Sequence, residues 1–261
     1  MRLVTWNVNS IRRRLEHLER FVKEWQPDVL CLQESKVKDA DFPATALVDM
    51  GYPHQLIHGQ KSYNGVAIIS RKPFKNPEKK IWCDNDDCRH ASVRLEGIEV
   101  HNFYVPAGGD KPDPEKNEKF AHKLAFLSEM QDWARERNIA RKKVIIMGDL
   151  NVAPLEWDVW NHKRLKRSVG HTPLECEKML SFWQAGRLLD VPRHFFPEPA
   201  PLYSWWGYRY PQAFAKDYGW RLDHMLATPA LRGAVKDLQV AKETRSWERP
   251  SDHVPLVLDI A

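Results

Sequence analysis

Short runs of large apolar residues recur along the chain, and the most informative one spans residues 144–147. Four consecutive apolar residues predict a strand that is buried on both faces, and we expect Gly148 to end it in a turn. Asp149 and Asn151 then stand at the carboxyl end of this strand, where open α/β sheets place their ligands. A carboxylate beside a neutral amide suits a phosphate held with a hard cation, although Asp and Asn are also common turn formers.

Two further strands are predicted near the start of the chain. Residues 3–9 form an apolar strand that ends in two amides, the first of them Asn7, and residues 28–34 form a buried strand that delivers Glu34 at its carboxyl end. Between these strands, Ser10 is expected to cap a helix whose apolar residues recur at helical spacing. The two strand ends therefore present polar side chains toward the same edge of a sheet.

The middle of the chain has the alternation of an antiparallel sheet. The predicted elements are a helix at residues 42–50, strands at 52–58 and 65–70, a charged loop at 72–89, and a hairpin of strands at 91–95 and 100–105. Tyr104 stands at the end of the last of these strands. Its local sequence alone favours a half-buried ring with a solvated hydroxyl.

The second half of the chain adds helices and a group of aromatic residues. The predicted elements are an amphipathic helix at residues 117–138, a basic loop at 161–170, a helix at 174–185 and a strand at 219–226. Residues 203–210 hold five aromatic rings, which favours a partly exposed surface for stacking on unpaired bases, with core packing as the alternative. Asp223 has apolar neighbours, and Asp252 precedes His253 at the edge of a final strand. A carboxylate could orient that imidazole as an acid, a base or a charge stabiliser.

Composition limits the class of protein without choosing a function. A chain of 261 residues, 43% of them hydrophobic, can bury one large core, and no linker or repeat divides it, so we expect one domain over residues 1–261. The first residues form no apolar leader, and no later run is long enough to span a membrane. We therefore expect a cytoplasmic protein that is neither secreted nor bound to a membrane. A net charge of +5 and eleven tryptophans are compatible with a polyanionic partner, but also with many metabolic enzymes.

The four cysteines are expected to be reduced thiols, with Cys31 a small core residue. Cys83, Cys88 and His90 suggest a zinc site by their spacing. No second pair of ligands follows at a plausible distance, so we do not expect structural zinc.

Several short motifs, taken together in their order and spacing, are highly specific. They are Trp6-Asn7-Val8-Asn9, Leu32-Gln33-Glu34, Gly65-Val66-Ala67-Ile68, Tyr104-Val105-Pro106, Gly148-Asp149-Leu150-Asn151-Val152-Ala153, Gly219-Trp220-Arg221-Leu222-Asp223 and Ser251-Asp252-His253. Along nearly its whole length the chain resembles the exonuclease III type of apurinic/apyrimidinic (AP) DNA repair endonuclease, within the endonuclease/exonuclease/phosphatase superfamily. The resemblance implies a four-layer α/β sandwich, with two mixed β-sheets packed face to face and helices outside.

The same resemblance implies a reaction and a metal. Water attacks the phosphodiester 5′ to an abasic sugar and leaves a 3′-hydroxyl, with 3′ to 5′ exonuclease and 3′-phosphatase activity expected alongside. Mg²⁺ is the implied cofactor, with Mn²⁺ as a substitute, and whether one or two ions bind stays open. The implied partner is double-stranded DNA with abasic sites or blocked 3′ ends, and the protein is expected to act as a monomer.

Site residues follow from the motifs one by one. Glu34 is implied as the principal metal ligand, with Asn7 and Asp252 beside it. Asp149 is implied as the group that activates or orients water, and Asn151 as a phosphate contact. Asp223 is implied as the residue that orients His253 against the phosphate. The wider set of possible metal ligands is Asn7, Glu34, Asp149, Asn151, Asp252 and His253. Tyr104 is implied either as a donor to a phosphate oxygen or as a phenolate nucleophile or base.

The resemblance also implies a DNA surface. Arg12, Lys36, Tyr63, Asn64 and Arg89 match positions that contact backbone phosphates, and Trp205, Trp220 and Leu222 match positions that wall a pocket for a flipped sugar. One departure is that Ala107 stands where many relatives place an Asn or Gln. Two alternatives remain: a non-catalytic nucleic-acid-binding regulator on the same fold, and a phosphodiesterase for another substrate.

Overall fold

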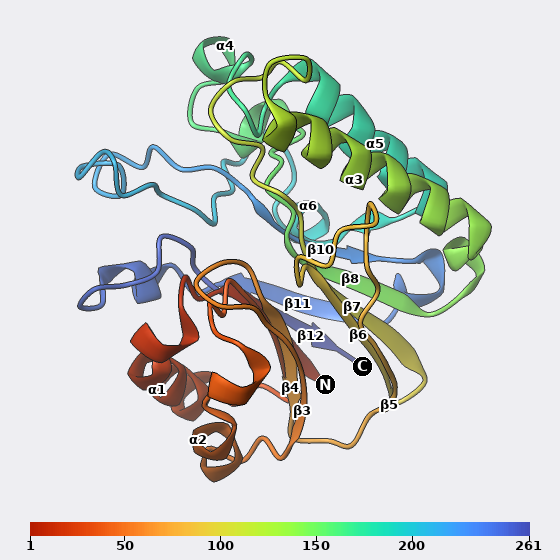
Figure 1. Cartoon of the computed structure of the whole chain (residues 1–261), viewed down its shortest axis with the longest axis vertical. Coiled ribbons are helices and arrows are strands. Elements are labelled where there is room, and N and C mark those ends of the chain that lie inside the picture. Colours follow the sequence, from red (N-terminus) through yellow and green to blue (C-terminus); the bar gives the residue numbers. More distant parts are fainter.

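The computed structural model describes residues 1–261 and consists of two six-stranded sheets packed face to face between layers of helices (Figure 1). The first sheet has the order β11 (Val235–Val240), β12 (Leu256–Ile260), β1 (Arg2–Asn7), β2 (Val29–Gln33), β4 (Val66–Ser70) and β3 (His54–His58). The second has the order β5 (Lys75–Glu78), β6 (His90–Leu95), β7 (Ile98–Tyr104), β8 (Val144–Asp149), β10 (Asp223–Ala227) and β9 (Leu189–Asp190). The expected four-layer sandwich is confirmed.

Helices cover the outer faces of both sheets. Below the first sheet in Figure 1 lie α1 (Leu15–Trp25) and α2 (Ala44–Asp49), and above the second lie α3 (Glu118–Glu136) and α5 (Pro173–Gly186). The short helices α4 (His162–Leu165) and α6 (Val191–Phe195) belong to the connections that follow β8. No helix of the chain combines the length and the apolar character that crossing a membrane requires.

Three apolar clusters hold these layers together. The cluster between the sheets is the largest and takes residues from both, such as Cys31 of β2 and Met147 of β8. A second cluster, which includes Phe21, seals the first sheet against α1, and a third seals the second sheet against α3 and α5 through residues such as Phe126 and Phe182. The strands alternate their side chains between an inter-sheet face and a helix-covered face, which explains why the central strands are apolar throughout.

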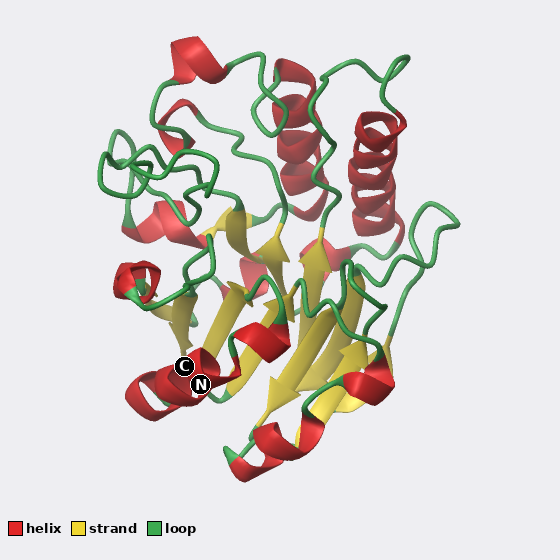
Figure 2. Ribbon diagram, turned by 60° about the vertical axis from the view of Figure 1, so that its left-hand side comes forward, coloured by secondary structure: helices red, strands yellow, loops and turns green.

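Parallel pairs of strands place the motif residues at one edge of each sheet. β1 pairs with β2 in parallel, with Asn7 opposite Gln33, and β7 pairs with β8 in parallel, with Tyr104 opposite Asp149. β10 runs antiparallel to β8 and begins at Asp223, which also lies opposite Asp149. The expected convergence of strand ends is therefore confirmed in both sheets. Figure 2 shows long loops gathered beyond the ends of the strands.

One expectation about the Val144 strand is wrong. Gly148 does not end the strand in a turn, because β8 continues through it to Asp149. Gly148 has φ +143°, and a Cβ added there would lie 1.9 Å from the carbonyl oxygen of Phe103 on β7. Glycine is needed because the neighbouring backbone approaches too closely for a side chain.

Other differences concern element boundaries. Ser10 makes no side-chain cap, since a short 3₁₀ turn at Ile11–Arg13 precedes α1. The loop expected at residues 72–89 contains the edge strand β5, and the basic loop at 161–170 contains α4. The strand expected at 219–226 begins at Asp223. The long helix expected at 117–138 is confirmed as α3, with Asn117 as its N-cap.

Candidate active site

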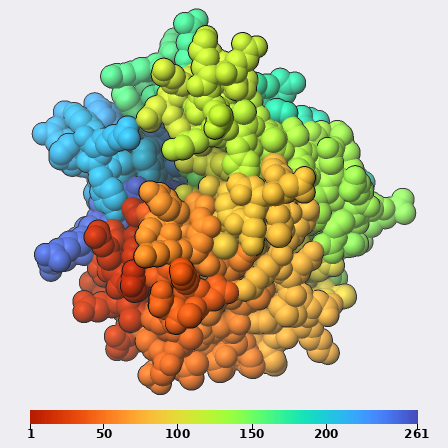
Figure 3. All heavy atoms as spheres, viewed as in Figure 1, coloured from red at the N-terminus to blue at the C-terminus, as the bar shows by residue number.

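A cavity of about 470 Å³ opens where the motif-bearing strand ends of the two sheets meet. Nine of the predicted site residues line it: Glu34, Tyr104, Asp149, Asn151, Trp205, Trp220, Leu222, Asp252 and His253. In Figure 3 the surface is hollowed at the left, between the light blue segment near residue 210 and the red and orange N-terminal part. Polar groups form the floor of the cavity and aromatic rings form one wall, so it can accept a ligand that is anionic at one end and flat at the other.

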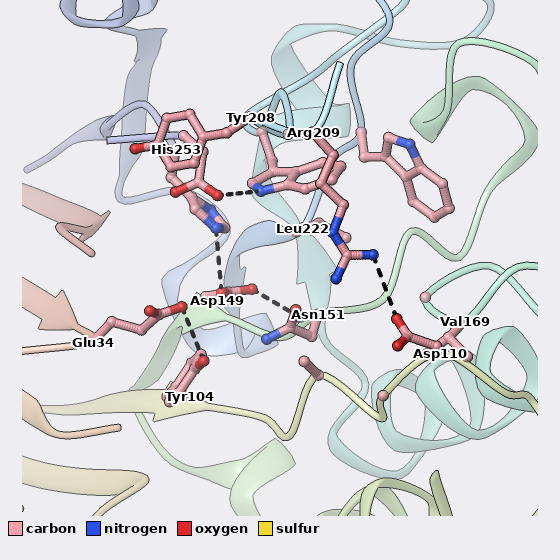
Figure 4. Close-up of a pocket in the computed structure, with 17 residues that line it drawn as sticks. Glu34, Tyr104, Asp110, Asp149, Asn151, Val169, Tyr208, Arg209, Leu222 and His253 are labelled. Carbon is pink, nitrogen blue, oxygen red and sulfur yellow. Dashed lines mark hydrogen bonds and ion pairs between the residues drawn. The ribbon is translucent and has the colours of Figure 1, made fainter. Parts of the chain in front are cut away.

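Three ionisable side chains from distant parts of the chain form the polar floor. Ligand atoms of Glu34, Asp149 and His253 all lie within 4.8 Å of one another. Glu34 follows β2 in a left-handed conformation, with φ 54°, which an ordinary glutamate adopts only under strain. This conformation turns its carboxylate toward the second sheet, where Figure 4 shows it facing Tyr104 and Asp149.

Asn7 forms hydrogen bonds to both carboxylates. Its side-chain Nδ2 donates to Glu34 Oε1 at 2.8 Å and to Asp149 Oδ2 at 2.9 Å, while its Oδ1 accepts from the backbone N–H of Asn9. Asn7 therefore directs its amide nitrogen to the acidic cluster, and it would have to turn its oxygen to become a metal ligand. On the other side of Glu34, the ammonium of Lys36 lies 2.6 Å from Oε2.

These neighbours set the charge states of the two acids. Burial acts to raise the pKa of Glu34, but Lys36 and Asn7 outweigh it, so this pKa is lowered. Burial raises the pKa of Asp149. The positive charge of His253 acts to lower this pKa, and the negative charge of Asp223 acts to raise it further. Glu34 is thus the more firmly ionised carboxylate, and Asp149 is the one that can take up a proton near neutral pH.

His253 is held by a buried carboxylate. Its Nδ1 donates to Asp223 Oδ2 at 2.8 Å, which leaves Nε2 directed at Asp149 Oδ2, 3.6 Å away. Burial acts to lower the pKa of His253, but the carboxylates of Asp223 and Asp149 outweigh it and raise this pKa. The expected pairing of Asp223 with His253 is confirmed as a contact, and it favours a cationic ring in the cavity.

The local expectation for Tyr104 is wrong. Its ring is buried, and its hydroxyl donates to Glu34 Oε1 at 2.9 Å. Burial, followed by the charges of Glu34 and Asp149, raises the pKa of Tyr104. The guanidinium of Arg89 lies over the ring, 4.9 Å from its centroid. The hydroxyl is therefore a protonated donor that points into the acidic cluster.

Asn151 lies beside the acids on the turn that follows β8. Its Nδ2 donates to the carbonyl of Val105, and its backbone N–H donates to Asp149 Oδ1. Lys123 of α3 supports this turn from behind: its fully buried ammonium lies 2.7 Å from the carbonyl oxygen of Asn151 and 2.5 Å from Glu175 of α5. The amphipathic pattern of α3 gave no sign of this role, because a lysine in a helix usually faces solvent.

The aromatic wall lies next to the acids. Trp205 and Trp220 meet edge to face with ring centroids 6.2 Å apart, and Leu222 lies beside them. Trp205 Nε1 donates to Asp252 Oδ2 at 2.9 Å, and the other oxygen of Asp252 accepts from Asn9. Asp252 is thus tied into the rim of the cavity. The expected partly exposed surface at residues 203–210 is confirmed, although Trp206 within it is buried.

The mouth of the cavity carries a contact that the sequence did not suggest. Arg209 and Asp110, both highly exposed, approach within 3.7 Å of each other (Figure 4). Asp110 follows Ala107 in the loop where the chain departs from the expected motif. This loop therefore helps to shape the opening rather than the acidic floor.

The predicted phosphate contacts lie outside the cavity. Tyr63 is 72% exposed and Arg12 is also exposed, so both are free to meet a ligand. Lys36 is paired with Glu34, Asn64 donates to the carbonyl of Asp87, and Arg89 pairs with the Asp87 carboxylate.

The donor set of the acidic cluster fits a divalent hard cation. Carboxylate oxygens of Glu34 and Asp149 converge from two sheets, and the Asn7 side chain hydrogen-bonds to both. Asp252 lies at the rim of the same cavity. Carboxylate and amide oxygens are the ligands that Mg²⁺ and Mn²⁺ take in proteins. Nothing in this cluster offers a thiolate, which a softer metal would favour.

Comparisons with known proteins agree on one family. The model of the Endonuclease/Exonuclease/phosphatase family matches residues 4–253. The chain is 30% identical to exodeoxyribonuclease III of Haemophilus influenzae over 98% of each sequence. An AP endonuclease from Archaeoglobus fulgidus has a TM-score of 0.93 and 33% identity, with 100% of this chain and 99% of that one covered. The 3′ phosphatase NExo from Neisseria, bound to a product DNA hairpin, has a TM-score of 0.92 and 33% identity, with the same coverage.

Proposed function

The chain belongs to the endonuclease/exonuclease/phosphatase family, in its exonuclease III and AP endonuclease group, and we propose that it hydrolyses the phosphodiester 5′ to abasic sites in double-stranded DNA. The product is a 3′-hydroxyl, and Mg²⁺ is the cofactor, with Mn²⁺ as a substitute. We further propose that residues 1–261 act as one domain, as a monomer and in the cytoplasm.

One observation carries this proposal. Glu34, Asp149 and His253 converge within 4.8 Å in a cavity whose adjoining wall is made by Trp205 and Trp220. A phosphate can therefore meet acids and an imidazole while the sugar attached to it meets flat apolar rings. An abasic sugar is easily turned out of a duplex because no base pair has to be broken.

Glu34 is the proposed principal metal ligand, with Asp149, Asn151, Asp252, His253 and a turned Asn7 as the further candidates. A divalent ion held there would neutralise charge on the phosphate and polarise a bound water. The lowered pKa of Glu34 keeps its carboxylate ionised for this purpose.

Asp149 and His253 are the proposed reactive groups. Asp149 is buried and has a raised pKa, so it can accept a proton from water while it orients the attacking oxygen. As the new phosphorus–oxygen bond forms, the bond from phosphorus to the 3′ oxygen breaks, and this oxygen takes its proton from solvent. His253, held by Asp223 through Nδ1, directs Nε2 into the cavity and there donates to a phosphate oxygen as negative charge develops. The Asp223 carboxylate fixes the orientation of the ring and stabilises its cationic form.

Tyr104 and Asn151 complete the phosphate site in this proposal. The hydroxyl of Tyr104 donates to Glu34, so it is placed to move its hydrogen bond to a phosphate oxygen that enters beside the carboxylate. A raised pKa supports this donor role over a phenolate. One hydrogen of the Asn151 amide is used by Val105, and the second can contact the phosphate.

Outside the cavity, exposed Arg12 and Tyr63 are the proposed first contacts of the DNA backbone, and Lys36, Asn64 and Arg89 join them on the same surface. These contacts position the duplex without reading its sequence. They should give a salt-dependent affinity.

A 3′ phosphatase and 3′ to 5′ exonuclease activity is the second candidate. It is favoured because this chain is as similar to the Neisseria 3′ phosphatase as to the Archaeoglobus AP endonuclease, with 33% identity to each.

The deciding experiment uses three duplexes: one with an internal tetrahydrofuran abasic analogue, one with a 3′-phosphate at a nick and one with a recessed undamaged 3′ end. Each is incubated with purified protein in Mg²⁺ or in EDTA. We expect incision of the first duplex in Mg²⁺ only. A band shift without cleavage of any duplex would instead support the non-catalytic regulator, and the 3′-phosphate as the sole substrate would support the second candidate.

A His253→Asn variant is the matched control for contaminating nucleases. It keeps a hydrogen-bonding side chain of similar width but cannot become cationic, so the cleavage rate should fall by about 10²–10³-fold. Near-normal cleavage by this variant would remove His253 from the proposed mechanism.

A further inference from the structure

A second group of metal-ligating side chains lies away from the active site, at the edge where the two sheets meet. It consists of His58 at the end of β3, and Asp86 and Cys88 on the segment that leads into β6. One ligand atom from each of the three lies within 4.8 Å of the other two. Sequence spacing pointed to Cys83, Cys88 and His90 instead, because it could not show that β3 brings His58 to this segment.

The hydrogen bonds of His58 leave one of its ring nitrogens facing an acid. Nδ1 lies 3.0 Å from the carbonyl oxygen of His90, and a carbonyl oxygen only accepts, so Nδ1 carries the proton. In a neutral imidazole Nε2 then carries a lone pair and no hydrogen, and this nitrogen lies 3.1 Å from Asp86 Oδ1. Two acceptors at this distance need either a hydrogen shared between the ring and the carboxylate or a cation that binds both.

Cys88 distinguishes a cation site from a simple ion pair. Its thiol is mostly buried, and Sγ lies within 4.8 Å of a ring nitrogen of His58 and of a carboxylate oxygen of Asp86. Tetrahedral Zn²⁺ with ligands at about 2.0 to 2.3 Å places its ligand atoms about 3.3 to 3.6 Å apart, close to the separation seen here for His58 and Asp86. The bond from Nδ1 to a backbone carbonyl is the outer contact that zinc-bound imidazoles commonly make.

We propose that His58, Asp86 and Cys88 bind one Zn²⁺ ion, with the fourth position taken by water. A thiolate, an imidazole and a carboxylate form a donor set that suits Zn²⁺ and differs from the all-oxygen preference of Mg²⁺. On binding, the Cys88 Sγ–H bond breaks, the proton passes to solvent and a Sγ–Zn bond forms. The side chain of Asp86 is 63% exposed, which gives the ion a route from solvent.

The charge around the thiol favours a cation. Burial, and then the negative charges of Asp86 and Asp39, raise the pKa of Cys88 to about 11. Without a metal the thiol is therefore protonated at neutral pH and inert. A divalent ion would neutralise the carboxylate and the thiolate together, whereas a single proton neutralises only one of them.

The ion would stabilise a segment that faces the proposed DNA surface. The carbonyl of Asp87, between two of the ligands, accepts from Asn64, and the Asp87 carboxylate pairs with Arg89. β3 belongs to the first sheet and β6 to the second. A bound ion would thus join the sheets at this edge and fix two of the predicted phosphate contacts.

Cobalt absorption tests the site without relying on activity. Metal-free protein, kept reduced with a phosphine, is titrated with Co²⁺, and the thiolate-to-cobalt charge-transfer band is recorded in the near ultraviolet. We expect the band to saturate at one ion per chain and Zn²⁺ to abolish it. A Glu34→Gln variant should retain the band, because the acidic cluster of the active site holds no thiol.

Variants of the cysteines assign the ligand. Cys88→Ser should lose the band, whereas the matched controls Cys83→Ser and Cys176→Ser should keep it. Asp86→Asn, at an exposed position that tolerates change, should weaken Co²⁺ binding by about tenfold or more. Three results would each overturn the proposal in favour of a plain ion pair between His58 and Asp86. They are the absence of a band in the wild type, a band that survives Cys88→Ser, and an unchanged Co²⁺ affinity in Asp86→Asn.

Discussion

Substitution of Asp158 by Asn should be among the most destabilising single changes outside the cavity. Asp158 is fully buried and accepts hydrogen bonds from Arg221 at 2.9 and 2.8 Å and from Arg193 at 3.2 and 2.5 Å. Arg221 is itself fully buried and also pairs with Asp190. The network lies directly behind the wall of the cavity, because Arg221 stands between Trp220 and Leu222 in the sequence.

The expected cost follows from what the substitution leaves behind. An Asn side chain keeps the volume but removes the charge, so Arg221 retains Asp190 alone while Arg193 has no acidic partner. Breaking a buried ion pair by removing one partner costs about 3 to 5 kcal/mol. With a urea dependence of about 2 to 3 kcal/mol per molar, the unfolding midpoint should fall by about 1 to 2.5 M.

The pH dependence supplies a second test with a definite sign. Burial acts to raise the pKa of Asp158, but Arg221 and Arg193 outweigh it, so the pKa is lowered on folding. The stabilisation is therefore present above the ordinary aspartate pKa of about 3.9 and is lost as the pH falls through the lower folded-state value. The gap in unfolding free energy between the wild type and Asp158→Asn should be constant near pH 7 and shrink in acid.

The matched control is the exposed ion pair between Glu96 and Lys72, whose charged atoms lie 2.8 Å apart. Glu96→Gln removes the same kind of contact at the surface and should cost less than about 1 kcal/mol. Urea unfolding followed by tryptophan fluorescence measures both variants. Equal midpoints for Asp158→Asn and Glu96→Gln, or a gap that widens in acid, would refute the reasoning.

Three further substitutions test other parts of the account. Gly148→Ala would place a Cβ 1.9 Å from a carbonyl oxygen of β7 and should destabilise the fold by at least about 1 to 3 kcal/mol, which lowers the melting temperature. An unchanged melting temperature would show that β7 and β8 can separate freely to admit the side chain. Lys123→Met leaves the buried charge of Glu175 unpaired and frees the Asn151 turn, so stability should fall and KM for abasic DNA should rise. A loss of stability with unchanged KM would show that Lys123 supports the fold and not the binding of substrate. Tyr104→Phe removes one donor and should lower kcat by about 10 to 100-fold without changing the pH profile, while a shifted alkaline limb would support a phenolate.

Much of the fold could be predicted from residue patterns because the strands that carry the site are buried on both faces. The continuous apolar runs ending in Asn7, Glu34 and Asp149 mark β1, β2 and β8, and helical spacing marks α3. The two edge strands of the second sheet escaped prediction. β5 has the exposed sequence Lys-Asn-Pro-Glu and β9 has only two residues, so neither carries a periodic apolar signal.

Contacts between the sheets could not be predicted in the same way. Tyr104 looked solvated because local sequence does not show that Glu34 approaches from the other sheet. The buried amide of Asn102 on β7 likewise accepts from Gln33 of β2 at 2.7 Å, a link that depends on how the sheets stack. Such residues become visible only when the tertiary structure places them together.

The central claim is that Glu34 and the groups around it hold one divalent ion against one phosphate. Single-turnover incision of the tetrahydrofuran duplex across a range of Mg²⁺ concentrations, for the wild type and Glu34→Gln, tests it most directly, with duplex binding in EDTA measured in parallel. We predict that Glu34→Gln shifts the Mg²⁺ midpoint upward by at least about tenfold while binding in EDTA stays the same. Superimposable Mg²⁺ curves for the two proteins would contradict the claim.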